Sequence, residues 1–232
     1  MMRVYIGYDP AETEAAEVCA KSLRFVTQGQ LEPEFLRLPK IAAQGLITRP
    51  FDYRGDQIYD LVSNDTASTQ FKITRFLVPM LCQSGYALFL DCDMLFTADP
   101  REMLVDVRAE NAVSVVKHPE YKPVESTKMM GLVQTTRKRK NWSSVMLFNC
   151  DHPANRRLSL RDVNERTAEE LHTFYWLNDS EIGELAPRWN WLVNVQPKPQ
   201  YPGIAHFTLG GPWFKGWPGA DYDDLWLSAR DA

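Results

Sequence analysis

Two aspartates separated by one cysteine, Asp91-Cys92-Asp93, directly follow the apolar run of residues 87–90. A buried strand that ends in this way delivers both carboxylates to the carboxyl edge of a sheet, where open α/β folds bind their ligands. Carboxylates held close together repel each other unless one is protonated or a cation neutralises both. A divalent metal that also binds a diphosphate meets this need, because hard cations take oxygen ligands. The motif therefore predicts a metal-dependent enzyme acting on a nucleotide diphosphate compound, with a plain strand-end turn as the alternative.

A second Asp-x-Asp, Asp221-Tyr222-Asp223, lies near the C-terminus and is followed by Asp224 and Leu225-Trp226-Leu227. Acids just before an apolar, helix-forming segment are typical of N-caps and first turns, where they complement the helix dipole. The first motif instead interrupts hydrophobic sequence, because Met94-Leu95-Phe96 follows it. We therefore assign ligand binding to the first motif and helix capping to the second.

His206 precedes a loop that contains Gly210, Gly211 and Trp213. Adjacent glycines let backbone amides approach an anion closely. A histidine combined with two aspartates makes a nitrogen and oxygen ligand set, which suits Mn²⁺ better than Mg²⁺. His206 is therefore a candidate third metal ligand, and the alternative is a histidine with a purely structural role.

The elements that must position these residues alternate between strands and helices. Apolar runs predict strands over residues 3–7, 35–38, 86–90, 113–116, 145–148 and 205–209. Helical spacing predicts helices over residues 12–28, 70–83, 168–177 and 223–229, the second of them kinked by Pro79. This alternation predicts an α/β fold with a single, doubly wound, mostly parallel sheet and helices on both faces. Residues 39–69 are polar and predicted to be irregular, and a loop of that length is typical of a functional segment.

The C-terminal region is predicted to be irregular and is rich in aromatic residues: Trp189, Trp191, Tyr201, Trp213, Phe214, Trp217, Tyr222 and Trp226. Such rings either pack a region that lacks regular helices or stack on sugars and nucleobases. We expect packing for most of them. Trp213 and Trp217 flank the glycine loop, so these two are the candidates for ligand contact.

Composition limits the classes of protein. A chain of 232 residues is long enough for one well-buried domain, and a net charge of −4 argues against a nucleic-acid binder that depends on phosphate contacts. The four cysteines contain no CxxC pair and predict reduced thiols. The sequence shows no signal-peptide pattern and no apolar run of the roughly 20 residues that span a bilayer. We therefore expect a cytoplasmic protein without a transmembrane segment.

The Asp91-Cys92-Asp93 motif, the segment Val145-Met146-Leu147-Phe148-Asn149 and the loop opened by His206 together resemble the family 8 glycosyltransferases. These are retaining enzymes of the GT-A fold, related to glycogenin and to bacterial lipopolysaccharide galactosyltransferases, and the chain looks like a divergent bacterial or phage-like branch. The resemblance covers most of the chain in order. It implies transfer of a hexose from a nucleotide sugar, UDP-hexose in this family, to a glycan, lipid-linked or protein acceptor.

The resemblance also implies roles for individual residues. Within one domain over residues 1–232, residues 1–100 would form the nucleotide-binding half, and residues 101–232 the acceptor-binding half with the metal-ligand loop. Asp91, Asp93 and His206 would hold Mn²⁺ or Mg²⁺, and Asp93 with Arg75 would be catalytic. The residues that would contact the nucleotide are Tyr8, Asp9, Asp91, Cys92, Gly210, Gly211 and Lys215. The alternative for Arg75 is a solvent-exposed charge on a helix.

The chain departs from the family pattern at three places. Gly211 stands where the family has a lysine that grips the diphosphate, and Lys215 is the candidate replacement. The family's Asn-x-Gly reads Trp142-Ser143-Ser144 here, which affects the acceptor side. The family's Asp-Gln pair is absent, which leaves Glu170 and Asp179, together with Trp213, as candidates for the sugar or acceptor side.

Other classes of protein remain open at this stage. A non-catalytic module that binds a sugar nucleotide or a partner fits the missing lysine and the missing Asp-Gln pair. A sugar nucleotidyltransferase needs a glycine-rich phosphate loop after its first strand, and a dinucleotide oxidoreductase needs GxGxxG there. Residues 7–12, Gly-Tyr-Asp-Pro-Ala-Glu, supply neither. The basic run of residues 137–140 is either a solvated loop or a site for an anionic acceptor.

Overall fold

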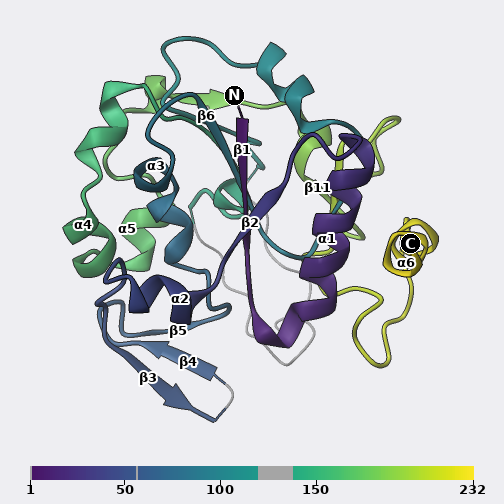
Figure 1. The fold of residues 1–232 in the computed structure, drawn as a ribbon, viewed down its shortest axis with the longest axis horizontal. Coiled ribbons are helices and arrows are strands. Elements are labelled where there is room, and N and C mark those ends of the chain that lie inside the picture. The colour runs from purple at the N-terminus through teal and green to yellow at the C-terminus, as the bar shows by residue number, and fades with distance from the viewer. Residues whose placement is uncertain (1, 56, 120–137) are drawn as a thin grey trace.

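A computed structural model describes residues 2–55, 57–119 and 138–232 (Figure 1). Its main sheet has six strands in the order β10-β8-β9-β6-β1-β2. Their bounds are β1 Met2–Gly7, β2 Pro33–Leu36, β6 Tyr86–Leu90, β8 Val113–Val115, β9 Val145–Asn149 and β10 Ile182–Glu184. Three of the pairings are parallel, and only β9 runs antiparallel to its neighbours β6 and β8. The predicted α/β fold with a mostly parallel central sheet is confirmed.

The directions of the strands determine which residues share an edge. Because β9 is antiparallel to both β6 and β8, these two strands run in the same direction as β1. Leu90 at the end of β6 pairs with Val145 at the start of β9, and Val115 pairs with Met146 beside it. The segments that follow β1, β6 and β8 therefore leave the sheet at one edge, which we call the site edge. In Figure 1, β1 runs from the N-terminus at the top toward this edge at the bottom.

Helices lie on both sides of the sheet (Figure 1). The α-helices are α1 Thr13–Val26, α2 Leu38–Ala43, α3 Val78–Leu81, α4 Leu160–Glu165, α5 Ala168–His172 and α6 Asp223–Asp231. The 3₁₀ helices span Pro10–Glu12, Thr74–Leu77, Pro100–Val105, Trp142–Ser144, Pro153–Arg157, Asp179–Glu181 and Pro187–Asn190. Helix α1 buries Ala15, Val18, Cys19 and Ser22, whose spacing of three and four residues makes one face, and α6 packs against it. Asp223 and Asp224 occupy the first turn of α6, as predicted, but the predicted capping is wrong, because the N-cap residue is Tyr222 and no side chain caps this helix.

Two three-stranded sheets join the main one. The first contains β11 Trp191–Leu192, β12 Ile204–His206 and β7 Met94–Phe96, and the second contains β3 Phe51–Arg54, β4 Gln57–Asp60 and β5 Asp65–Ala67. A separate cluster around the first sheet contains Val18, Trp191, Phe207 and Trp226, and Trp213 and Trp217 pack against it. The C-terminal aromatic residues thus largely form a core, as most of them were expected to do.

The prediction that residues 39–69 are irregular is wrong, because this segment forms α2 and the antiparallel sheet β3-β4-β5 (Figure 1). A buried ion pair explains how so polar a segment is ordered. Arg49 Nη2 lies 2.6 Å from Asp60 Oδ2, and both side chains are fully buried. Arg49 Nη1 also donates to the carbonyl of Arg166, 2.6 Å away, so this sheet is tied to the end of α4.

Two predicted helices are also shorter than expected. Residues 70–83 contain only the 3₁₀ helix Thr74–Leu77 and α3, because Pro79 lacks an N–H and the carbonyl of Phe71 accepts from the side chain of Arg75, 3.3 Å away. The helix predicted over residues 168–177 ends at His172, since Phe174 adopts a left-handed backbone with φ of 57°. Over the described residues, no helix has the length and apolar character that crossing a membrane would require.

Candidate metal centre

Asp91, Asp93 and His206 come together at the site edge. Asp91 and Asp93 follow β6, and Met94, the first residue of β7, pairs with His206, the last residue of β12. This antiparallel register places the imidazole beside the acids, so that one ligand atom from each residue lies within 4.8 Å of the others. His206 Nε2 is 3.4 Å from Asp93 Oδ2, and both side chains are largely buried. Residues 115 positions apart in the chain therefore form one ligand set.

Asn190 determines which nitrogen of His206 faces the acids. Asn190 Nδ2 donates to the carbonyl of Asn141 at 3.0 Å, which leaves Asn190 Oδ1 to accept from His206 Nδ1 at 2.8 Å. With its proton on Nδ1, the neutral imidazole presents the lone pair of Nε2 toward Asp93. Ligating histidines are typically oriented by such a hydrogen bond on the other ring nitrogen. Asn190 is fully buried, so the orientation is held by packing as well.

Arg75 is buried beside Asp91 and is not a solvent-exposed charge. Its Nη1 lies 2.9 Å from Asp91 Oδ1 and donates to the carbonyl of Ser143 at 2.8 Å. Burial raises the pKa of Asp91 above its usual value, Arg75 opposes this shift, and the neighbouring Asp93 adds to it. Arg75 therefore balances one of the two carboxylates, and the second negative charge still favours a cation.

The donor set fits a divalent metal. Two carboxylates and an imidazole lone pair converge in a buried place, and hard or borderline cations take these ligands. A cation between Nε2 of His206 and Oδ2 of Asp93 would relieve the approach of two acceptor atoms toward each other. The described part of the chain contains this one group of three or more such ligands.

Asn190→Ala removes the acceptor that orients His206. We expect the affinity for Mn²⁺ to fall about 10- to 100-fold, because the imidazole can then rotate or change tautomer. Titration of Mn²⁺ followed by electron paramagnetic resonance measures the free ion directly. Asn194→Ala is the matched control, since Asn194 is exposed and its amide donates to Gly219. Unchanged Mn²⁺ affinity in a folded Asn190→Ala variant would contradict the orienting role.

The loop after His206 is shaped by its glycines. Gly210 has a φ of 120°, which L side chains rarely adopt. A Cβ at Gly211 would lie 2.0 Å from Cζ3 of Trp213, so the indole occupies the space that any side chain would need. Trp213 in turn stacks near Trp226, with 5.6 Å between ring centroids. This loop therefore places backbone groups, rather than side chains, beside the metal ligands.

Residues after β1 form the other end of the site edge. Tyr8 donates or accepts a hydrogen bond with Thr13, and the guanidinium of Arg37 lies 3.5 Å from the centre of its ring. Asp9 accepts from the backbone N–H of Ala11 and Gln70, which joins β1 to the segment that carries Arg75. These contacts hold the Tyr8 ring and the Asp9 carboxylate in place next to the end of β6.

Cys92 points away from the ligand set. Its Sγ donates to Glu12 Oε2 at 3.3 Å, and burial raises the pKa of the thiol well above its usual value. All four cysteines are free thiols. Lys215 is exposed in the loop after Trp213.

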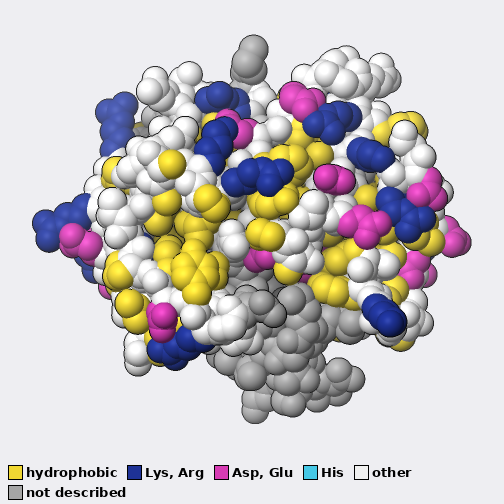
Figure 2. Space-filling view, turned by 60° about the horizontal axis from the view of Figure 1, so that its bottom comes forward, with side chains coloured by type: hydrophobic (Ala, Val, Ile, Leu, Met, Phe, Trp, Pro, Cys, Tyr) yellow, Lys and Arg dark blue, Asp and Glu magenta, His cyan; other side chains and the backbone are white. Residues whose placement is uncertain are grey.

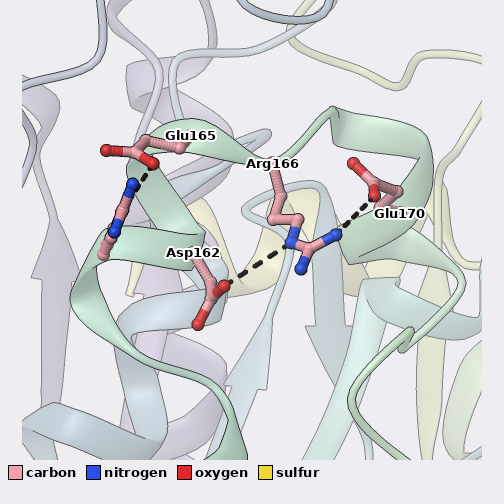
Figure 3. A pocket seen from close by; sticks show the side chains of 5 residues that line it. Asp162, Glu165, Arg166 and Glu170 are labelled. Carbon is pink, nitrogen blue, oxygen red and sulfur yellow. Dashed lines mark hydrogen bonds and ion pairs between the residues drawn. The ribbon is translucent and has the colours of Figure 1, made fainter.

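Glu170 and Asp179 are held in ion pairs. Glu170 accepts from Thr167 in a capping box at the start of α5 and pairs with Arg166 at 2.9 Å. Figure 3 shows Arg166 between Glu170 and Asp162, and the same shallow pocket contains the pair Arg161–Glu165. Asp179 pairs with Arg139, which belongs to the basic run; Arg137 of that run lies outside the described residues. Each arginine of the pocket in Figure 3 is thus paired with an acid, and the three acids outnumber the two arginines.

Sequence reasoning missed Asn190 and the partner of Arg75. The signal for Asn190 was a polar residue between two tryptophans, Trp189 and Trp191, which predicts a buried amide that needs hydrogen-bond partners. The Arg75–Asp91 pair had no local signal in the sequence.

Figure 2 turns the lower side of Figure 1 forward. On this face, described side chains of both charges are interspersed with hydrophobic ones.

Comparison with known sequences finds a relative that matches nearly the whole chain. No family model matches the chain. Protein CDI of Arabidopsis thaliana is 40% identical over 236 residues, which cover 99% of this chain and 86% of that protein. The two sequences thus correspond over most of both lengths.

Solved glycosyltransferases have a similar fold. The match to the galactosyltransferase LgtC has a TM-score of 0.60 at 13% identity and covers 100% of this chain and 95% of that one. GlyE of Streptococcus pneumoniae TIGR4 gives a TM-score of 0.59 at 16% identity, with 99% of this chain covering 60% of the GlyE chain. Mouse xyloside xylosyltransferase 1 gives 0.52 at 11% identity, with 91% and 100% covered. These likenesses establish a GT-A fold of the family 8 type.

Proposed function

We propose that this chain, which belongs to the same family as Protein CDI of Arabidopsis thaliana and has the GT-A fold, is a metal-dependent glycosyltransferase. The observation that carries the proposal is the buried set of Asp91, Asp93 and a correctly oriented His206 at the carboxyl end of β6. In open α/β sheets this edge binds ligands, and the side chains of Asp91 and Asp93, 14% and 13% exposed, are not those of a solvated turn. The donor we propose is a UDP-hexose, with transfer that retains configuration, as the family 8 resemblance implies.

Different residues of the chain would bind different parts of the nucleotide-sugar donor. Tyr8 and Asp9, after β1, would meet the nucleobase, and Cys92 would contact the nucleotide through its backbone. Gly210 and Gly211 would line the diphosphate with their backbone; the N–H of Gly210 already donates to the carbonyl of Phe207, so the Gly211 amide would be the donor to the diphosphate. Lys215 would supply the positive charge that, in the family, comes from a lysine at the position of Gly211.

Asp91, Asp93 and His206 would hold Mn²⁺ or Mg²⁺, which when bound supplies Lewis-acid stabilisation of the charge on the leaving diphosphate. Arg75 forms an ion pair with Asp91 and opposes the rise that burial causes in the pKa of this carboxyl, and its positive charge would stabilise the negative charge that develops on the leaving group. His206 Nε2 lies 3.4 Å from Asp93 Oδ2, so the two would share the cation. The acceptor side would be formed by residues 101–232, with Trp213, Asp179 and Glu170 as the candidates. The acceptor itself would be a glycan, lipid-linked or protein group in the cytoplasm.

The pairing of both acidic candidates favours a second function, a module that binds a sugar nucleotide without turning it over. Glu170 and Asp179 are each occupied by an arginine, so neither carboxylate is poised to support a positively charged sugar ring. Multiple turnovers of a UDP-sugar would exclude this alternative.

Calorimetric titration of UDP into the protein tests the proposal. We expect binding in Mn²⁺ and its loss in EDTA, because the diphosphate and the carboxylates repel each other without the cation. Hydrolysis of UDP-glucose and UDP-galactose over several turnovers would then establish catalysis. UDP binding that is indifferent to EDTA would refute the metal-dependent site, and binding without turnover would support the module.

A further inference from the structure

His118 is a buried histidine outside the ligand set, and one of its nitrogens has no partner among the described residues. Its side chain is 5% exposed, and Nε2 makes no hydrogen bond within that part of the chain. Burial, followed by the influence of His206, lowers the pKa of His118 to about 4, so the ring is neutral at neutral pH. Buried polar groups without a partner are uncommon and cost stability, which makes this nitrogen a candidate ligand contact.

The hydrogen bonds of Gln196 identify the tautomer of His118. Gln196 Oε1 accepts from the backbone N–H of Leu192 at 3.3 Å, so the other side-chain atom, Nε2, is the donor. This donor lies 3.0 Å from Nδ1 of His118, which must accept. The ring proton is therefore on Nε2, and His118 presents an N–H that needs an oxygen acceptor.

Two chains of contacts connect His118 to the metal set. Gln196 joins it to Leu192, which pairs with His206 in the register of β11 and β12. On the other side, the Trp142 indole donates to the carbonyl of His118, and the neighbouring Asn141 accepts from Asn190, the residue that orients His206. His118 also follows β8, whose carboxyl end lies at the site edge. Hydrogen bonds and strand pairing thus connect the His118 imidazole to the residues that position the metal ligands.

The strand order indicates which part of a donor would reach His118. Along the site edge, the residues after β1 come first, the metal set after β6 comes next, and His118 after β8 lies beyond β9. On the proposed function, the nucleobase lies at β1 and the diphosphate at β6. The group that continues past the metal, away from the base, is the sugar.

We propose that the Nε2–H of His118 donates a hydrogen bond to a hydroxyl of the donor sugar and makes His118 a specificity-determining residue. This inference rests on the proposed function, since it assumes a nucleotide sugar at the site edge. A site that hydrogen-bonds a sugar hydroxyl discriminates strongly against donors that lack it in the right orientation.

The test compares binding of UDP, UDP-glucose and UDP-galactose, each with Mn²⁺, to the wild type and three variants. His118→Phe keeps a flat ring and removes the donor, and we expect on the order of tenfold weaker binding of the preferred UDP-hexose with unchanged binding of UDP. His118→Gln can return an N–H to the position of Nε2 and should recover part of the affinity. His152→Phe is the matched control, because His152 follows β9 at the opposite edge of the sheet.

A second readout is independent of whether the variants fold. In wild-type protein with ¹⁵N-labelled histidine, the Nε2–H resonance of His118 should shift on addition of the UDP-hexose and stay in place with UDP. Equal weakening of UDP and UDP-hexose by His118→Phe, or an unmoved resonance, would overturn the sugar contact. A wild type that binds no UDP at all would instead refute the proposed function, and the inference would fall with it.

Discussion

Asp93→Asn is expected to weaken Mn²⁺-dependent binding of UDP by at least about 100-fold, since a metal held by two carboxylates and an imidazole loses one of its charged ligands. The substitution keeps the shape of the side chain and removes one negative charge. It also relieves the repulsion with Asp91, so the free energy of unfolding in EDTA should stay the same or rise. The measurements are calorimetric titration of UDP and chemical denaturation in EDTA.

The chain supplies its own control for this variant. Asp221 belongs to the second Asp-x-Asp, is more than half exposed and pairs loosely with Lys198. Asp221→Asn should leave UDP binding in Mn²⁺ unchanged. If Asp93→Asn binds UDP as tightly as the wild type, or if Asp221→Asn loses binding to the same extent, then Asp91-Cys92-Asp93 is not the metal motif.

Arg75→Met is expected to destabilise the protein by about 3–5 kcal/mol in EDTA, because it leaves Asp91 buried without its cationic partner. Mn²⁺ should restore part of this loss, since a bound cation would take over the compensation of Asp91. Burial lowers the pKa of Arg75 while Asp91 and Asp93 raise it, so these carboxylates stabilise the buried guanidinium. Denaturation curves with and without Mn²⁺ measure both effects.

Arg49→Met provides the comparison, since it breaks the other buried ion pair, Arg49–Asp60. We expect a loss of similar size, about 3–5 kcal/mol, that Mn²⁺ does not restore. If Mn²⁺ restored the stability of both variants, the metal would be stabilising the protein from a site other than Asp91. If Mn²⁺ restored the stability of neither variant, a bound cation would not be able to replace Arg75 in compensating the charge of Asp91.

Several features of this protein could be predicted from local sequence. The apolar run that becomes β6, the acids after it and the glycine loop after His206 all depend on residues adjacent in the chain. Burial of the strand and the place where it ends follow from such a pattern without knowledge of partners. The helical face of α1 and the first-turn acids of α6 were predictable for the same reason.

Predictions failed where distant residues compete with local preference. The sequence of residues 70–83 has helical spacing, yet the side chain of Arg75, which pairs with Asp91 and Ser143, also donates to the carbonyl of Phe71, which a helix would pair with a backbone N–H. Residues 39–69 are polar, yet they form a sheet because Arg49 finds Asp60 and the end of α4. Polarity alone does not show whether a charge will be solvated or paired.

The sequence by itself determined the ligand types and the strand that delivers them: two aspartates after an apolar run, and a histidine before two glycines. Only the tertiary structure decided that Asn190 turns the lone pair of His206 toward Asp93, that Arg75 is buried against Asp91, and that His118 stands beyond the metal set. The physical reason is that side-chain periodicity is a property of neighbouring residues. The direction of a lone pair and the balance of a buried charge depend on partners that strand pairing brings from elsewhere in the chain.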